Sequence, residues 1–212
     1  MKRYLLLGIL SMFALQCTQK EEEMAVISTK FGDMVVAFFP EVAPKHVESF
    51  KVLAKEGYFD GTTFHRVIPG FVIQGGDPNS RDEDRTNDGM GGRAGKYFGL
   101  GDEQDSATWT IPAEFNDSLH VRGTLSMARS QDPNSASSQF FICVDALPRL
   151  DHKYTVFGKV IQGLEVIDSI VAVPTPRKKD PFYRGIDGDN PLEKVEMTVR
   201  ILPRSQALAT ES

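Results

Sequence analysis

The sequence predicts a mainly β protein, built as a closed antiparallel eight-stranded β-barrel capped by two α-helices. Eight short runs of β-prone residues are separated by turn residues. Two other segments carry apolar residues at helical spacing. Strands and helices do not alternate, which argues against a parallel α/β sheet. Closure of the barrel is an inference, because the sequence shows strands and not their pairing.

The size and composition indicate a soluble globular protein with one domain, or at most two small ones. The chain has 212 residues, of which 41% are hydrophobic and 25% are charged. Its net charge of −5 argues against a nucleic-acid partner, since phosphate contacts need clustered Lys and Arg. No apolar run is long enough for a membrane-spanning helix in the mature protein.

The first residues have the pattern of an export signal. Lys2 and Arg3 precede an apolar run that ends before Gln16, so residues 1–16 are predicted to be a signal peptide. The stretch "FALQC" resembles a bacterial lipobox, which implies that Cys17 is lipidated and becomes the mature N-terminus. The alternative is a plain secretory signal with an incidental cysteine.

A short polar stretch follows Cys17. Residues 17–23 are expected to form the lipidated cysteine and a flexible tether. The run "TQKEEE" also resembles the export signal of surface lipoproteins, but a solvated tether explains it nearly as well. The predicted location is therefore the bacterial cell envelope, facing either the periplasm or the cell surface, with the membrane contacted only through the lipid.

The N-terminal half of the folded region predicts three elements. Residues 24–40 form a hairpin around Gly32, and residues 41–61 form an amphipathic helix. Residues 64–77 form strand, turn and strand. Residues 78–108 lack periodicity and are expected to be a long irregular loop.

The C-terminal half continues the β pattern. Strands are predicted at 123–128, 138–144, 154–161 and 192–202, and a second helix is predicted at 163–173. A segment rich in Pro, Gly and charge, residues 174–191, separates this helix from the last strand. The folded domain is thus expected to span residues 24–203, followed by a disordered tail over 204–212.

Metal, cofactor and nucleophile motifs are missing. The four histidines, at 46, 65, 120 and 152, are scattered without metal-ligand spacing, so no metal is predicted. Cys143 lies in an apolar run, where a thiol is inert. The run "GMGG" lacks the Lys-Ser/Thr of a phosphate loop, and no cofactor is predicted.

Three polar residues in apolar strands are more informative: Arg66, Gln74 and Gln139. Strand alternation places Gln139 on the same face as Phe141 and Cys143. A polar edge strand would explain this pattern, but a groove with an aromatic floor and a few hydrogen-bonding groups explains it better. An unpaired guanidinium among apolar residues is costly, so Arg66 must have a partner.

Four blocks in the same order complete the pattern: "FHRVIPGFVIQGGDP", "GTLSMARS", "SSQFFICV" and "LDHKYTVFGKVIQGLEVID". Together they resemble the signature blocks of the cyclophilin-type peptidyl-prolyl cis-trans isomerases, from about residue 24 to residue 202. The resemblance implies an enzyme that accelerates rotation of X-Pro bonds in exported proteins and assists their folding. Its partners would be proline-containing peptides and unfolded proteins, and the chain is expected to be a monomer.

The resemblance also assigns residues to roles. It implies that Arg66 is catalytic. It implies that substrate is bound by Phe71, Val72, Gln74, Gly89, Ala128, Arg129, Gln139, Phe141, Leu150 and Tyr154.

Three positions depart from the common pattern of the family. Arg129 replaces a common Asn, which should not harm a site that uses its backbone. Arg149 stands where drug-sensitive members have Trp, and Tyr154 stands where they have His. These two changes put tight cyclosporin binding in doubt more than catalysis.

The chemistry of the reaction explains why an arginine is needed. Amide resonance holds the X-Pro bond planar behind a barrier of about 18–20 kcal/mol. In the twisted transition state the prolyl nitrogen regains a lone pair, to which Arg66 can donate. The alternative is a proline-peptide-binding chaperone module without significant turnover, which would need the apolar pocket but not Arg66.

Overall fold

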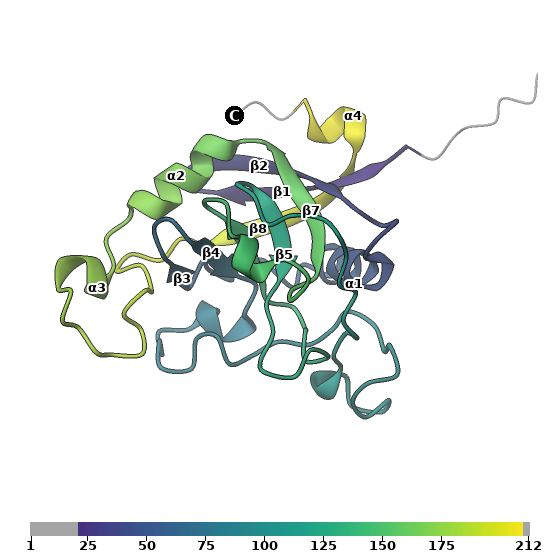
Figure 1. Ribbon diagram of the computed structural model, residues 1–212, viewed down its shortest axis with the longest axis horizontal. Helices are drawn as coiled ribbons and strands as arrows, with labels where there is room; N and C mark the ends of the chain where they lie inside the picture. Colours follow the sequence, from purple (N-terminus) through teal and green to yellow (C-terminus); the bar gives the residue numbers. More distant parts are fainter. Residues whose placement is uncertain (1–20, 210–212) are drawn as a thin grey trace, which may run out of the picture.

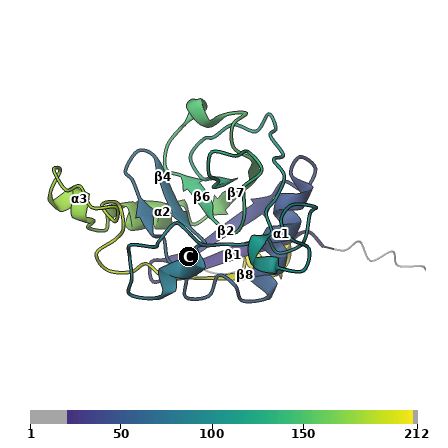
Figure 2. The same ribbon diagram turned by 90° about the horizontal axis from the view of Figure 1, so that it is seen from below.

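The fold is seen in a computed structural model that describes residues 21–209. Its central element is one eight-stranded antiparallel sheet that curls into a half-barrel, with the strand order β3-β4-β6-β5-β7-β2-β1-β8 (Figures 1 and 2). The strands are β1 (Glu23–Thr29), β2 (Gly32–Phe38), β3 (Arg66–Val67), β4 (Val72–Gly75), β5 (Thr124–Met127), β6 (Phe140–Cys143), β7 (Val156–Gln162) and β8 (Met197–Pro203).

The prediction of a closed barrel was wrong, because the two edges of the sheet do not form a ladder. The edge strand β3 is only two residues long, so it offers too little backbone to pair with β8. The edges approach each other through an isolated bridge between Thr63 and Glu196. Three backbone hydrogen bonds join these segments: Phe64 N to Val195 O at 3.0 Å, Met197 N to Thr62 O at 2.8 Å and Gly61 N to Met197 O at 3.0 Å.

Two helices cover the sheet, as the sequence predicted. They are α1 (Pro44–Lys55) and α2 (Leu164–Ala172). Proline at the first position of α1 matches the fixed backbone angle of a helix start. The structure adds short helical turns that the sequence did not predict: η1 (Pro78–Arg81), η2 (Ser106–Thr108), η3 (Pro148–Leu150), α3 (Pro176–Lys179) and α4 (Arg204–Ala207).

The sheet has a large apolar core on one face and a smaller apolar cluster on the other. Alternation along β6 divides its residues between them: Phe140 and Ile142 belong to the large core, and Phe141 and Cys143 belong to the small cluster. The predicted split of this strand is therefore confirmed. The small cluster also contains Val72, Leu147 and Leu150, with Phe71, Ala128 and Tyr154 packed against it.

Both ends of the described chain are ordered, and they lie beside each other. Glu23 pairs with Pro203 in the β1–β8 ladder, and Glu22 O accepts a hydrogen bond from Arg204 N at 2.8 Å. Residues 21–23 therefore do not behave as the flexible tether that was expected. Residues 204–207 form α4 rather than a disordered tail, because the buried Ala207 joins an apolar cluster with Met24.

The predicted signal peptide and Cys17 lie outside the described residues. Between residues 21 and 209, no helix combines the length and the apolar character needed to cross a bilayer.

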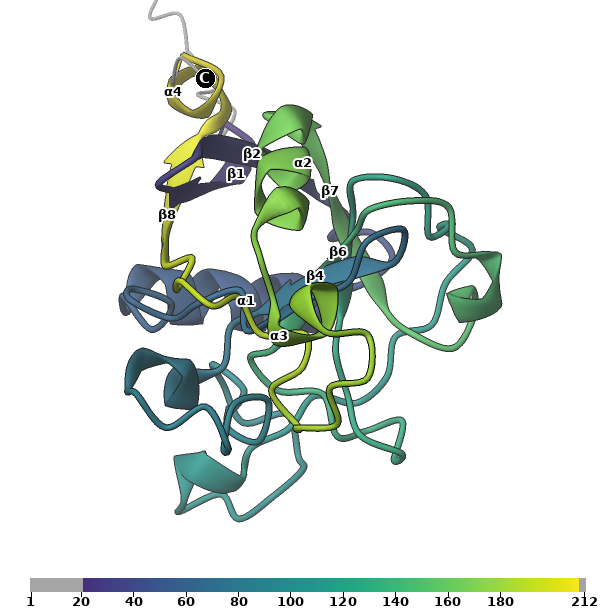
Figure 3. The same ribbon diagram turned by 90° about the vertical axis from the view of Figure 1, so that its left-hand side faces the viewer.

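Two long segments contain only short helical turns. Residues 78–108 run along the bottom of Figures 1 and 3, opposite the end that carries α4. Residues 174–191 include α3, which lies near β3 and β4 in Figure 1 and near β4 in Figure 3. The long loop that the sequence predicted at 78–108 is confirmed, except for its two short 3-10 turns.

Candidate active site

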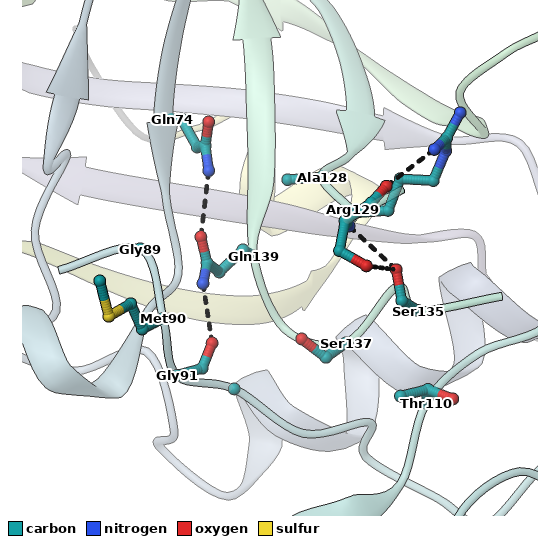
Figure 4. A pocket seen from close by; sticks show the side chains of 12 residues that line it. Gln74, Gly89, Met90, Gly91, Thr110, Ala128, Arg129, Ser135, Ser137 and Gln139 are labelled. Carbon is teal, nitrogen blue, oxygen red and sulfur yellow. Dashed lines mark hydrogen bonds between the residues drawn. The ribbon is translucent and has the colours of Figure 1, made fainter. Parts of the chain in front are cut away.

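Arg66 is the first residue of β3, directly opposite Gln74 in the β3–β4 ladder. Its Nη1 donates a hydrogen bond to Gln74 Oε1 at 3.3 Å. Gln74 Nε2 then donates to Gln139 Oε1 at 3.0 Å, and Gln139 Nε2 donates to Gly91 O at 2.7 Å. Figure 4 shows the last two of these bonds. The three polar residues singled out in apolar strands therefore form one hydrogen-bonded chain.

The donor-to-acceptor direction of these hydrogen bonds follows from the arginine. A guanidinium carries only donors, so Gln74 must present its oxygen to Arg66 and its amide NH₂ to the next residue. The same constraint then passes to Gln139, whose NH₂ is left for the carbonyl of Gly91. Each amide is thus held in one orientation, and the guanidinium is held at the edge of the sheet.

A small cavity of about 120 Å³ opens beside Arg66. It is lined by Arg66, Phe71, Val72, Gln74, Ala128, Arg129, Phe141, Leu150 and Tyr154. Its apolar walls come from the small cluster on the outer face of the sheet. The ring of Phe141 meets the ring of Tyr154 edge-on, with centroids 5.7 Å apart. The cavity therefore suits a compact apolar ring within reach of a fixed cation.

Two other arginines lie at the rim of this cavity. The Arg149 guanidinium lies over the ring of Phe71, 4.6 Å from its centroid. The Arg129 guanidinium lies 4.5 Å from the Tyr154 centroid and donates to Lys153 O. Both contacts are of the cation–π type. The Arg129 side chain is therefore directed toward the Tyr154 side of the rim.

A second cavity of about 310 Å³ adjoins the first (Figure 4). It is lined by Gln74, Gly89, Met90, Gly91, Gly92, Thr110, Ala128, Arg129, Ser130, Ser135, Ser137 and Gln139. The fully buried carboxylate of Asp77 holds its glycine-rich wall by accepting hydrogen bonds from the backbone of Gly89 and Gly91. This wall is consequently a rigid part of the site.

All eleven residues that the sequence assigned to the site line one or both of these cavities. The sequence did not predict the contribution of Met90, Gly91, Gly92, Thr110 and the serines at 130, 135 and 137. Most of these residues lie in irregular loops, where periodicity gives no signal. Ser130 and Ser137 lie inside the sequence blocks that carry the family resemblance, so these two could have been found.

The structure also brings together a serine, a histidine and an aspartate that the sequence analysis did not connect. His120 Nδ1 lies 2.9 Å from Asp151 Oδ1, and His120 Nε2 lies 3.0 Å from Ser126 Oγ. This order resembles a hydrolase triad. However, Ser126 is fully buried and also lies 3.0 Å from the carbonyl of Thr155, so no substrate reaches it. The His120 ring stacks on Phe141, which makes the group a support for the cavity floor.

The structure gives no sign of thiol or metal chemistry in its described part. Burial raises the pKa of the Cys143 thiol to about 12, which keeps it protonated at neutral pH. Among residues 21–209, no three His, Cys, Asp or Glu side chains gather as metal ligands. What the site offers is an oriented guanidinium next to an apolar pocket.

Comparison with known proteins identifies this arrangement. The sequence model of the family described as "Cyclophilin type peptidyl-prolyl cis-trans isomerase/CLD" matches residues 24–196. The chain belongs to the cyclophilin family. The family's activity, cis-trans isomerisation of peptidyl-prolyl bonds, is accordingly the activity of this chain.

Curated relatives of this cyclophilin are named for the same activity. A probable peptidyl-prolyl cis-trans isomerase of Brucella abortus is 44% identical over 150 residues, covering 70% of this chain and 71% of the relative. Peptidyl-prolyl cis-trans isomerase-like 2 of Gibberella zeae is 41% identical over 167 residues, which cover 78% of this chain and 26% of that protein.

Solved structures share the cyclophilin fold. A cyclophilin-type isomerase of Cryptosporidium parvum, crystallised in the presence of the dipeptide Ala-Pro, has a TM-score of 0.68 and 30% sequence identity. The likeness covers 84% of this chain and 98% of that one.

Proposed function

We propose that this cyclophilin accelerates X-Pro rotation in exported proteins, assisting their folding, and that Arg66 is its catalytic residue. The observation that carries the proposal is the Arg66–Gln74 hydrogen bond at the mouth of the 120 Å³ apolar cavity. The proline ring would occupy this cavity, against Phe71, Phe141 and Leu150. The dipeptide Ala-Pro present with the Cryptosporidium cyclophilin supports a proline-containing ligand.

Catalysis then depends on a hydrogen-bond donor that is held in place before the X-Pro bond rotates. In the planar ground state the prolyl nitrogen shares its lone pair with the carbonyl, and in the twisted state the lone pair is localised. A guanidinium fixed near that nitrogen stabilises the twisted state more than either planar isomer. No proton is transferred and no covalent intermediate forms, so an always-charged donor suits the task.

The neighbouring residues hold the rest of the peptide. Gln74 orients the guanidinium, and Gln139 and the backbone around Ala128 and Arg129 offer hydrogen bonds to the peptide chain. The second cavity, beside Gly89, would receive a side chain that flanks the proline. Because Ala128 N already donates to Gln139 O at 2.9 Å, the strand edges that present these groups are fixed relative to each other.

The test is Arg66→Ala assayed with a proline peptide and a protease that cleaves only one isomer. Losing one preorganised donor costs about 2.7–4 kcal/mol of barrier, which corresponds to a loss of about 10² to 10³ in rate. Arg149→Ala, which removes a rim arginine, is the control and should keep turnover within a few-fold. A folded Arg66→Ala protein with normal turnover would refute the mechanism. A domain that suppresses aggregation equally well with and without Arg66, and shows no turnover, would favour the chaperone alternative.

The site of action is the cell envelope in this proposal. The N-terminal charges, apolar run and lipobox-like stretch support cleavage before Cys17 and lipidation of that residue. Several acyl chains on one cysteine hold a protein firmly at a membrane, whereas one chain does so marginally. Cys17→Ser should release the protein from membranes or leave it unprocessed, as seen by fractionation. Protease treatment of intact cells then separates a surface location from a periplasmic one.

A further inference from the structure

A third cavity lies on the other side of Arg66, and no part of the mechanism above uses it. Its volume is about 310 Å³. It is lined by His65, Arg66, Gln74, Arg85, Asp88, Gly89, Met90, Ile186, Asp187, Asp189 and Asn190. Arg66 and Gln74 also line the proline cavity, and Gly89 and Met90 also line the second cavity. The third cavity is therefore a continuation of the same groove.

One wall of this cavity is the 186–190 stretch of the long segment before β8, and it is firmly attached. Asp189 O accepts a hydrogen bond from Val67 N at 2.8 Å, so the wall continues from the edge strand that holds Arg66. Arg85 Nη2 donates to Leu192 O at 3.0 Å, and Asn190 Nδ2 donates to Asp88. These bonds join the segment to both sides of the cavity.

The charges that line the cavity are three carboxylates and two guanidinium groups. Asp189 is paired with Arg177, and Arg85 is occupied by the carbonyl oxygens of Pro191 and Leu192. Arg66 is directed to Gln74. The remaining carboxylates, Asp88 and Asp187, have no cation bound to them among the described residues.

These two carboxylates keep spare acceptor capacity. Asp187 Oδ1 accepts from the Tyr183 hydroxyl at 2.8 Å, and a carboxylate oxygen pair can accept about four hydrogen bonds. The enclosed Oδ1 of Asp88 has no hydrogen-bond partner in the described part of the chain. Burial raises the pKa of Asp88, so its hydrogen bond from Asn190 and the nearby cations Lys194 and Arg85 offset only part of the cost of burying its charge.

His65 points to a missing ligand independently of the carboxylates. Its side chain is buried, with 5% of the residue exposed, and it lines this cavity. Neither ring nitrogen has a hydrogen-bond partner within residues 21–209. Buried polar groups are nearly always satisfied, and a neutral imidazole has one acceptor nitrogen. That nitrogen and the unsatisfied carboxylate oxygen of Asp88 can both accept from a donor outside the chain.

The rim of the cavity is apolar on both sides. Met90 and Ile186 are each 73% exposed, which is unusual for large hydrophobic residues. Long basic side chains bury their aliphatic stems along apolar surface while their charged ends stay with polar partners. The rim and the carboxylates together fit such a side chain.

Building on the proposed function, we propose that this cavity is a specificity subsite that takes a Lys or Arg side chain near the proline of the substrate. The aliphatic stem would lie between Met90 and Ile186, and the cation would contact Asp187 and Asp88. The enzyme would therefore prefer proline sites that are flanked by a basic residue.

The experiment is a turnover assay with matched proline peptides. Each peptide carries Lys, norleucine or Glu at one of the two positions before or after the proline, so that chain length and apolar stem stay comparable. At one of these positions kcat/KM should be highest for Lys and lowest for Glu. The Lys-to-norleucine ratio should be about fivefold, near the upper end for an accessible ion pair. Asp187→Asn and Asp88→Asn, made separately, should each bring this ratio toward one.

Asp180→Asn is the matched control, because Asp180 lies in the same segment but outside the cavity. It should leave the Lys-to-norleucine ratio unchanged. Equal kcat/KM for the Lys and norleucine peptides at every position, or a Lys preference that survives in both aspartate variants, would overturn the subsite. Turnover of the norleucine peptides measures the isomerase itself, so a failure of the proposed function is seen separately, as a loss of all activity.

Discussion

Arg66 and Gln74 face each other across the β3–β4 ladder and are joined by a side-chain hydrogen bond of 3.3 Å. The pair couples backbone register to catalytic geometry, because a shift of one residue in this short ladder would move one side chain to the other face of the sheet. The position of the guanidinium is therefore set by strand pairing as well as by its own hydrogen bond.

Gln74→Leu should lower kcat/KM about tenfold or more, because a hydrogen bond to a charged group contributes about 1.5–3 kcal/mol. Arg66 would remain but would lose the acceptor that orients it. The loss should appear in kcat rather than in KM, measured with the protease-coupled assay. Gln104→Leu, at an exposed loop residue, is the control. Unchanged kcat in a folded Gln74→Leu protein would contradict this role.

Cyclosporin should inhibit this cyclophilin weakly. Arg149 lies over Phe71 and offers no indole for the ligand to pack against. Arg149→Trp should lower the inhibitor concentration needed for half inhibition while changing turnover little. The prediction is wrong if the parent protein is already inhibited by nanomolar drug.

Acid should destabilise the fold through His65. Burial lowers the pKa of His65 from 6.5 to about 4, whereas the unfolded chain keeps the ordinary value. Between these two pH values the unfolded state binds more protons, so stability falls as pH decreases from 6.5 toward 4. This one group lowers the free energy of unfolding by roughly 3 kcal/mol between pH 6.5 and pH 4.

The contribution of His65 can be isolated by comparison. Denaturant unfolding of His65→Gln should show a shallower decline in unfolding free energy between pH 6.5 and pH 4 than the parent. His152→Gln is the control, because the His152 side chain is 64% exposed. If His65→Gln declines as steeply as the parent, the acid sensitivity has another origin.

Cys143 should report unfolding. Its thiol is fully buried and burial raises its pKa to about 12, so the native protein contains almost no thiolate. In a Cys17→Ser background, a thiol reagent that becomes coloured on reaction should label Cys143 only as fast as the protein unfolds. Addition of denaturant should raise the rate in step with unfolding measured by circular dichroism. Rapid labelling in native buffer would show that β6 is accessible.

Local patterns predicted a large share of this fold. Alternation along 138–144 separated Phe140 from Phe141 correctly, because a strand has a fixed period of two. The spacing of Val47, Phe50 and Leu53 likewise predicted α1, and all three are buried. Such signals are carried by neighbouring residues, so one sequence is enough to see them.

The features that the sequence did not predict depend on contacts between residues far apart in the chain. The half-barrel stays open because β3 is two residues long, which the apolar run from Phe64 to Ile73 did not reveal. The association of His120, Asp151 and Ser126 and the wall at 186–190 also arise from chain pairing rather than from local pattern. The site residues were assigned by resemblance, and their geometry came only from the structure.

The proximity of the two ends has a practical consequence for engineering. Glu22 forms an ion pair with Arg204, the first residue of α4. In Figure 3, α4 and the 78–108 loop lie at opposite ends of the molecule. A short linker between residues 209 and 21, with new termini opened in the exposed stretch at 101–106, would give a circular permutant with an undisturbed groove. The protein could then be fused to a client or a reporter beside its own catalytic face.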